Sequence, residues 1–228
     1  MSFRGFGPQA IPFLKALAFH QNKEWFEANR ITFERDAKEP MGDLIEDLSA
    51  TFAKAKIPLK GDRKASIFRQ NRDVRFAKDK SPYKTNLGAV MSRGGAKNDK
   101  GFLYIHLSPE RCFSAAGFYM PEPADLAKMR SAIVRAPKVW AEIAGKLSAA
   151  GFEFMEEDAL KRLPKGFEDV ADPAVAEAIK RKTIVCGRDI AEARLGRPEL
   201  VAELVDFTKK SMPLMNWGWA AIADERTK

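Results

Sequence analysis

The sequence predicts an α+β fold: N-terminal helices, a central, mostly antiparallel sheet, and C-terminal helices. Two observations predict this class. Apolar residues recur at helical spacing in the first 56 residues and again after residue 121, but alternate with period two over residues 102–108. The connections between the predicted strands are short, which favours hairpins over crossover helices. Segregated helices and strands are typical of an α+β domain. At 228 residues, the chain is expected to form one domain over residues 1–228.

Three helices are predicted before residue 57. Asn22 is a suitable N-cap for the second, which continues through Phe33. Pro40 either ends that helix or starts the third. The predicted apolar stripes of the first and third helices are Ala10, Phe13, Leu14 and Leu17, and Met41, Leu44, Ile45, Leu48 and Phe52.

The helical period disappears between residues 66 and 119, where strands are predicted. Residues 66–70, 87–92 and 112–119 have strand character, and a turn is expected at 94–101. In the strand around 102–108, Leu103, Ile105 and Leu107 alternate with polar and aromatic residues, which places Tyr104 and His106 together on the opposite face.

Helices return after Pro121. The predicted stripes are Leu126, Met129 and Ile133 in one helix and Val139, Ile143 and Leu147 in the next, which Gly151 closes. Further on, Asp172 and Pro173 are expected to start a helix, residues 183–186 a strand, and Pro198 the last long helix.

The net charge of +8 is concentrated in one part of the chain. Residues 60–97 contain 11 Lys and Arg against 3 Asp, a net charge of +8, and the remainder contains 28 of each sign. A concentrated positive charge attracts phosphates, carboxylates or nucleic acid, whereas an evenly spread one affects only solubility. The structural alternative is a solvated basic loop.

Several functional classes are not indicated. No apolar run approaches the roughly 18 residues of a membrane span, and the N-terminus does not resemble a signal peptide, so a cytoplasmic protein without membrane association is expected. Two cysteines and two histidines, Cys112, Cys186, His20 and His106, are too few for a disulfide framework or a His-rich metal site, so no metal is predicted. No phosphate-binding loop or catalytic motif is recognised, which leaves catalysis, cofactor and oligomeric state open.

Residues 69–86 alternate cations with single carboxylates and also contain aromatic and hydroxyl side chains. A core strand would not tolerate so many cations, and an exposed linker would not need the rings. Arginine can hold a phosphate or carboxylate through two parallel hydrogen bonds, and lysine adds a point charge. The predicted ligand contacts are Arg72, Arg75, Lys78, Lys80, Tyr83 and Lys84. The alternative is a salt-bridged loop held over the sheet by Phe76 and Tyr83.

The same segment carries a family resemblance. Residues 71–86, which run from Asn71-Arg72-Asp73 to Lys84-Thr85-Asn86, resemble the hallmark of the conserved hypothetical proteins of domain-of-unknown-function family 2461. Matching pieces at 22–26, 117–123, 163–167 and 213–214 extend the resemblance over nearly the whole chain. The resemblance implies a single-domain, mostly bacterial protein, with no activity and no catalytic residues to carry over.

Three functions are consistent with the basic segment. A shaped pocket for a small phosphate- or carboxylate-bearing ligand is favoured, because acids and hydroxyls are interleaved with the cations. A nucleic-acid-binding module is the second, since Phe76, Tyr83 and Tyr104 could stack bases, although the aromatic ribonucleoprotein signature is missing. The third is a protein-interaction module that docks an acidic partner.

Overall fold

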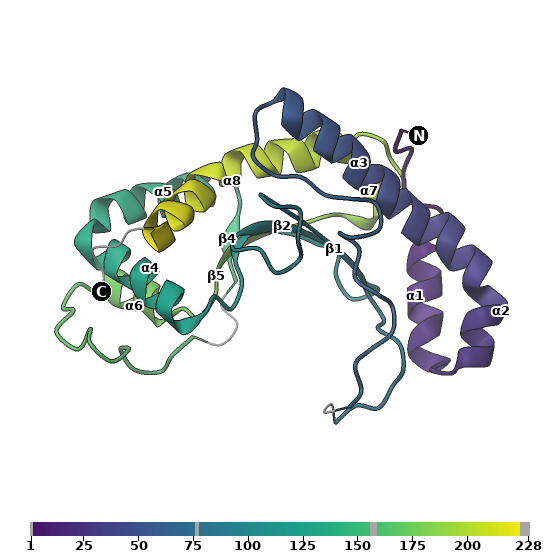
Figure 1. Cartoon of the computed structure of the whole chain (residues 1–228), viewed down its shortest axis with the longest axis horizontal. Coiled ribbons are helices and arrows are strands. Elements are labelled where there is room, and N and C mark those ends of the chain that lie inside the picture. The colour runs from purple at the N-terminus through teal and green to yellow at the C-terminus, as the bar shows by residue number, and fades with distance from the viewer. Residues whose placement is uncertain (1, 76–77, 156–158, 224–228) are drawn as a thin grey trace. The chain divides into compact units, whose positions relative to one another are not determined.

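A computed structural model describes residues 2–75, 78–155 and 159–223 (Figure 1). It confirms the α+β class, with a five-stranded antiparallel sheet of strand order β1-β2-β3-β5-β4. Helices precede the first three strands, as predicted, whereas β4 and β5 lie between C-terminal helices. The strands are β1 (Leu87–Ser92), β2 (Phe102–Leu107), β3 (Phe113–Phe118), β4 (Glu153–Phe154) and β5 (Ile184–Asp189).

The chain forms two compact units, which are described separately. The first comprises Met1–Asp99, Leu103–Ser114 and Asp189–Phe207, and the second Lys100–Phe102, Ala115–Arg188 and Thr208–Lys228. The interpretation of the whole chain as one domain stays a prediction.

The N-terminal helices of the first unit form where the sequence predicts them. They are α1 (Ala10–Phe19), α2 (Lys23–Phe33) and α3 (Glu39–Lys54), and α1 and α2 lie side by side (Figure 1). The Asn22 side chain caps α2 by accepting a 2.8 Å hydrogen bond from the Trp25 amide. A π-helical turn, η1 (Glu34–Lys38), joins α2 directly to α3, so Pro40 lies in the first turn of α3.

Asp36, on η1, is a buried carboxylate that secures the start of α1. It is 3% exposed, and one carboxylate oxygen accepts from the Gln9 amide at 3.1 Å. Arg35 donates to the same carboxylate at 2.5 and 3.0 Å. The Asp36 carbonyl oxygen also accepts from the Gly7 amide at 2.8 Å. Because the α1 N-cap residue, Gln9, makes no side-chain cap of its own, Asp36 satisfies an amide at the helix start from a distant element.

The prediction of a strand at 66–70 is wrong. Only isolated antiparallel bridges occur near it, Ile67 with Ala89 and Asn71 with Tyr83. Between the two bridges, one side spans four positions, from Ile67 to Asn71, and the other spans six, from Tyr83 to Ala89. The two extra residues form a bulge that interrupts the ladder. The Gln70 side chain fills the interruption, with its Nε2 donating to the carbonyl oxygens of Lys84 and Asn86.

The strand β2 follows its predicted alternation. Leu103, Ile105 and Leu107 are fully buried, and Tyr104 and His106 are partly exposed on the other face, as predicted. The first unit also contains α7 (Glu192–Leu195) and the beginning of α8 (Leu200–Ala223).

The second unit contains α4 (Pro123–Arg135), α5 (Pro137–Ala149), α6 (Pro173–Lys180) and the end of α8. One predicted stripe needs correction, because Val139 is 48% exposed. Trp140 is buried in its place, with ring centroids 5.4 Å from Phe154 and 4.9 Å from Trp217. The larger ring therefore takes the place of Val139, and the predicted Ile143 and Leu147 stay on the buried face of α5.

Both cysteines are buried and unpaired, Cys112 in the first unit and Cys186 in the second. Burial raises the pKa of the Cys112 thiol, and it raises that of Cys186 to about 11. Because the thiolate is the reactive form, we expect neither thiol to react with a maleimide at neutral pH in the native protein, and both to react after unfolding. Rapid labelling in native buffer, measured by mass spectrometry, would contradict this expectation.

Candidate anion-binding cleft

The first unit contains a cleft of about 790 Å³. Residues of α2, η1 and the first turn of α3 line it, together with residues 63–64 and 67–71, Lys84 and Lys97. Phe26, Phe33 and Ile67 are buried residues of its lining, and Phe68 is partly exposed. Two acidic residues, Glu34 and Glu39, line the cleft. The basic residues that line it are Arg30, Lys38, Arg63, Lys64, Arg69, Lys84 and Lys97.

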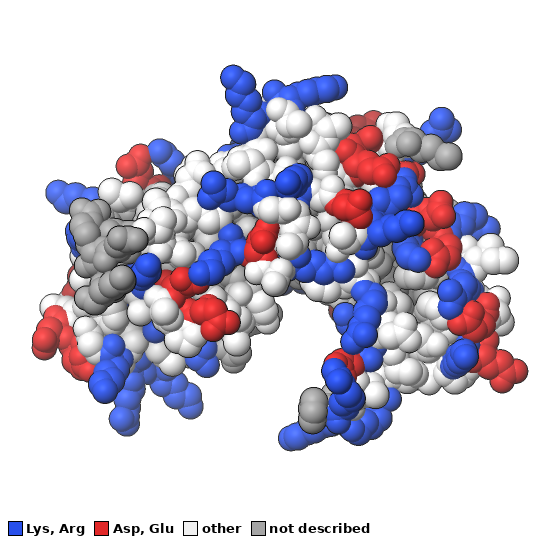
Figure 2. Space-filling model, viewed as in Figure 1, with Lys and Arg blue, Asp and Glu red and all other residues white. Residues whose placement is uncertain are grey.

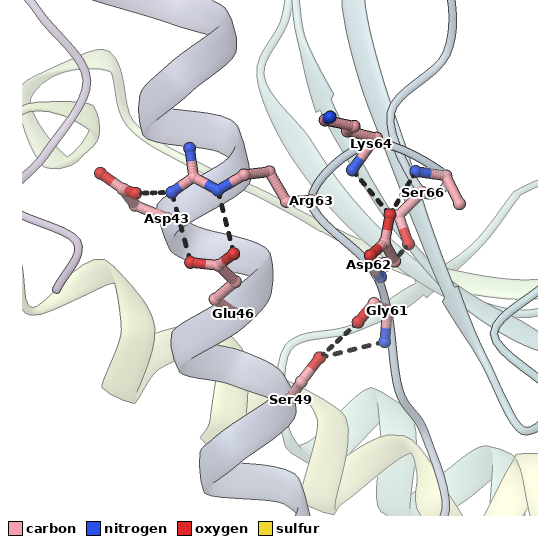
Figure 3. Close-up of polar contacts among 9 residues, drawn as sticks. Asp43, Glu46, Ser49, Gly61, Asp62, Arg63, Lys64 and Ser66 are labelled. Carbon is pink, nitrogen blue, oxygen red and sulfur yellow. Dashed lines mark hydrogen bonds and ion pairs between the residues drawn. The ribbon is translucent and has the colours of Figure 1, made fainter. Parts of the chain in front are cut away.

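Arg63 ties one part of the cleft lining to α3, as Figure 3 shows. Its guanidinium pairs with Asp43 and, at 2.9 Å, with Glu46. Next to it, the Ser49 hydroxyl accepts from the Gly61 amide at 3.0 Å and donates to the Gly61 carbonyl at 3.1 Å. These contacts fix the position of the turn that follows, so Arg63 is engaged structurally and its charge is balanced.

That turn presents Lys64 beside the cleft. The Asp62 carboxylate accepts from the amides of Lys64 at 2.8 Å and Ala65 at 2.7 Å, and the Ser66 hydroxyl accepts from the Asp62 amide at 3.0 Å (Figure 3). Such a local hydrogen-bonded turn fixes the backbone. The Lys64 side chain stays exposed and lines the cleft.

Several of the other cations are paired with carboxylates. Arg30 binds Glu27 at 2.6 Å, and Lys38 binds Glu34 at 2.8 Å. Arg69 is 3.9 Å from Asp73. In contrast, Lys64, Lys84 and Lys97 have no carboxylate within 4.0 Å among the described residues. The excess positive charge of the cleft therefore resides mainly on three lysines.

Two of these lysines contact the same aromatic ring. The Nζ atoms of Lys84 and Lys97 lie 5.4 and 5.0 Å from the centroid of Phe68. The Lys97 ammonium also donates to the carbonyl oxygen of Ile67. Burial, followed by the charges of Arg69 and Arg72, lowers the pKa of Lys84. Burial and the charge of Lys84 lower the pKa of Lys97. A bound anion would offset both effects, because it replaces lost hydration and separates two like charges.

The lowered pKa values predict a pH dependence. A lysine attracts an anion only when it is protonated, so affinity for sulfate is expected to fall as pH rises toward the ordinary lysine value of 10.5, and to begin falling below it. The Lys84→Arg/Lys97→Arg variant should show a flatter profile over the same range, because guanidinium stays charged. Calorimetric titration checks this, and equal profiles for the two proteins would contradict it.

The structure separates the predicted site residues. Lys84 lines the cleft, whereas Arg72, Arg75, Lys78, Lys80 and Tyr83 are not among its lining residues. Tyr83 is 5% exposed and stacks on Phe26, with centroids 4.4 Å apart and an angle of 11° between the rings. The Tyr83 ring is thus engaged in packing.

The other predicted contacts belong to the segment that joins Asn71 to Tyr83, on which Figure 2 shows Lys and Arg side chains gathered. Arg72 pairs with Asp79, and Arg75 pairs with Asp73 at 2.7 Å. These internal ion pairs are what the salt-bridged alternative predicts. The Lys80 ammonium donates to the Val74 carbonyl at 2.9 Å. Lys78 is exposed. Phe76, which that alternative also invoked, lies outside the described residues. As ligand contacts these residues stay predictions.

Sequence reasoning did not single out most of the cleft. Lys64, Arg69 and Lys97 belong to the basic stretch 60–97, so their charge is evident from the sequence. The sequence does not show that all three line one cleft. Arg30 and Lys38 come from helices far away in the sequence, and nothing local distinguishes them from ordinary surface cations.

Comparison with known protein families supports the resemblance. The family described as "Conserved hypothetical protein (DUF2461)" matches residues 9–217. The chain belongs to the DUF2461 family. No curated protein and no solved structure matches the chain.

A row of rings continues from the cleft along one face of the sheet in this DUF2461 protein. Phe68 lies 6.2 Å from Tyr104, which lies 5.9 Å from Phe113, and His106 stacks on Phe113 at 4.7 Å. The Nδ1 atom of His106 is 2.9 Å from the Tyr104 hydroxyl and 3.3 Å from the Asn86 amide nitrogen. Because the Asn86 amide nitrogen can only donate, Nδ1 accepts from it and the neutral ring carries its proton on Nε2. Burial lowers the pKa of His106, which favours the neutral ring.

In the part of the chain that the structure describes, no group of three or more His, Cys, Asp or Glu side chains is arranged to hold a metal ion. None of the helices in the same residues combines the length and the apolar character that crossing a membrane requires.

Proposed function

We propose that the cleft binds a small anion that carries a phosphate or carboxylate group. The observation that carries this proposal is the charge of the lining: seven basic and two acidic residues line about 790 Å³, and four of the seven basic residues pair with carboxylates. Pockets for small ligands have volumes of this order. Lys64, Lys84 and Lys97 have no carboxylate partner among the described residues, so their charge is available to a ligand.

The proposal places the anion against Lys84 and Lys97. Two ammonium groups near one apolar ring are poorly hydrated, and each disfavours the protonated form of the other. An anion between them forms charge-assisted hydrogen bonds in surroundings less polar than water, where such bonds are strong. The buried rings of Phe26 and Phe33 in the lining reduce solvent access.

Calorimetric titration with inorganic pyrophosphate, at low and moderate ionic strength, tests the proposal. Pyrophosphate is expected to bind at a single site and to bind more tightly than chloride. Absence of heat and of any thermal stabilisation at low ionic strength would overturn the proposal, because a ligand that binds only the folded state must raise the melting temperature.

Nucleic-acid binding is a second candidate, favoured by the ring row next to the cleft. Phe68, Tyr104 and Phe113 are partly exposed on one face, and Arg111 lies 5.2 Å over the Phe113 ring. Aromatic rings flanked by cations are the elements that bind single strands.

Oligothymidylate in the same titration distinguishes the two candidates. A single strand bound along the ring row should lose affinity with a log–log salt slope of about −0.7 per phosphate neutralised. A shaped pocket should instead discriminate pyrophosphate from other small anions and ignore the oligonucleotide.

A further inference from the structure

Lys84 has a fixed backbone and a side chain without polar partners. Its amide donates to the Gln70 carbonyl at 2.8 Å, and its carbonyl oxygen accepts from Nε2 of Gln70. The residue lines the cleft and is partly exposed. Among the described residues, no group accepts a hydrogen bond from the Nζ atom of Lys84, and no carboxylate lies within 4.0 Å of it. The amine is therefore open to a molecule bound in the cleft.

Lys97 lies beside the same ring, but its amine is engaged. The Nζ atoms of Lys84 and Lys97 lie 5.4 and 5.0 Å from the centroid of Phe68. The Lys97 ammonium donates to the carbonyl oxygen of Ile67, and a hydrogen bond from the charged form favours that form. No described group holds a proton on Lys84 in this way. The geometry thus gives the two lysines different roles, Lys97 as a cation and Lys84 as an amine.

The surroundings of Lys84 disfavour its protonated form. Burial, followed by the charges of Arg69 and Arg72, lowers the pKa of Lys84. Lys97 places a further cation beside the Phe68 ring and interacts with Lys84. Desolvation and a neighbouring cation are the two conditions that activate a lysine as a nucleophile, because they increase the fraction of neutral amine.

We propose that Lys84 forms an imine with an aldehyde or ketone that carries a phosphate group. The phosphate contacts Lys97, and the carbonyl carbon reaches Lys84. The nitrogen lone pair of the neutral amine forms the new bond to the carbonyl carbon, and both amine hydrogens leave with the carbonyl oxygen as water. The step requires no oxidant, reductant or further reactant. This inference rests on the proposed function and names a substrate class for the same cleft.

Reductive trapping with glyceraldehyde 3-phosphate and sodium cyanoborohydride tests the inference, because the reductant converts an imine into a stable secondary amine. Peptide mass spectrometry measures the rate of modification at each lysine. Lys84 is expected to react about tenfold faster than Lys78, which is exposed and outside the lining of the cleft. One charge-assisted hydrogen bond to the phosphate accounts for such a factor. Pyrophosphate should abolish the difference by occupying the cleft.

Two variants and a second aldehyde serve as controls. Lys84→Arg should remove the rapid modification, because a guanidinium group stays protonated. Lys78→Arg makes the same change outside the lining and should leave the rapid modification in place. Glyceraldehyde without phosphate should modify Lys84 about tenfold more slowly than the 3-phosphate does, and should modify Lys78 at a similar rate.

The outcomes separate this inference from the proposed function. If pyrophosphate binds the wild-type protein but glyceraldehyde 3-phosphate modifies Lys84 no faster than Lys78, the cleft is an anion site without a reactive amine, and the inference is wrong. Rapid modification of Lys97 in place of Lys84 would contradict it too. If pyrophosphate does not bind either, the proposed function fails as well. Should Lys84→Arg not fold, the modified positions in the wild-type protein still decide the inference.

Discussion

Replacing Lys84 and Lys97 together by methionine is expected to weaken pyrophosphate binding about 100-fold, with the fold retained. Hydrogen bonds to charged groups contribute about 1.5–3 kcal/mol each, so loss of two contacts corresponds to at least this factor. The free energy of unfolding should fall by no more than about 1 kcal/mol, the net value of the Lys97 hydrogen bond to the Ile67 carbonyl. Both ammonium groups are partly buried, have lowered pKa values, and have no carboxylate partner among the described residues. Methionine preserves most of the apolar contact with Phe68.

Lys78→Met is the matched control. It also removes a lysine from the basic stretch, but Lys78 is exposed and is not among the lining residues of the cleft. Its affinity for pyrophosphate should stay within about twofold of the wild-type value, as expected for a distant exposed charge screened by salt. If Lys78→Met loses as much affinity for pyrophosphate as Lys84→Met/Lys97→Met does, affinity depends on total charge and not on the cleft.

Asp36→Ala is expected to lower the free energy of unfolding by about 2–3 kcal/mol. The substitution leaves the Gln9 amide without its acceptor and removes the buried partner of Arg35. It also opens space beside Gly7, which approaches so closely that a Cβ atom there would lie 2.4 Å from the Asp36 Cγ. Because Asp36 links η1 to the start of α1, one substitution loosens two elements. Urea denaturation measures the effect.

Arg35→Ala separates the two contributions. Arg35 is 62% exposed, so its ion pair with Asp36 is expected to contribute less than about 1 kcal/mol. An equal loss in both variants would mean that the ion pair, and not the contact with the α1 amide, stabilises this corner of the unit.

The same carboxylate predicts a pH dependence of stability. The hydrogen bond from Arg35 is the largest effect that lowers the pKa of Asp36 below its ordinary value of 3.8. A carboxyl whose pKa is lower in the folded state stabilises the fold above the unfolded pKa, and this contribution is lost as pH falls through the folded pKa. Asp36→Asn should therefore reduce the loss of stability on acidification below pH 3.8.

The helices were predictable because their apolar spacing is local. The predicted apolar stripes differ from the buried faces at one position, where Trp140 is buried in place of Val139. The strand expected at 66–70 failed for a non-local reason: the residues facing it include two extra positions, and the Gln70 side chain replaces part of the ladder. Periodicity within one segment contains no information about the register of its partner.

The positive charge of the candidate site was predictable from the sequence, but the residues that line the cleft were not. The basic stretch pointed to Lys84, which lines the cleft, and equally to Arg72 and Arg75, whose charges are balanced by Asp79 and Asp73 within the same segment. Which cations pair locally and which remain for a ligand depends on side-chain geometry. The contribution of Arg30 from α2 depends on tertiary packing, which charge counting does not describe.

The most direct test of an anion site in the cleft compares two double variants in one calorimetric titration with pyrophosphate. Lys84→Met/Lys97→Met removes charge inside the cleft, and Arg75→Ala/Lys80→Ala removes equal charge from the segment outside its lining. If the anion binds in the cleft, the first variant loses about 100-fold in affinity for pyrophosphate, and the second binds nearly as the wild-type protein does. If binding is lost only in Arg75→Ala/Lys80→Ala, the anion binds the basic segment, and the proposal of an anion site in the cleft is wrong.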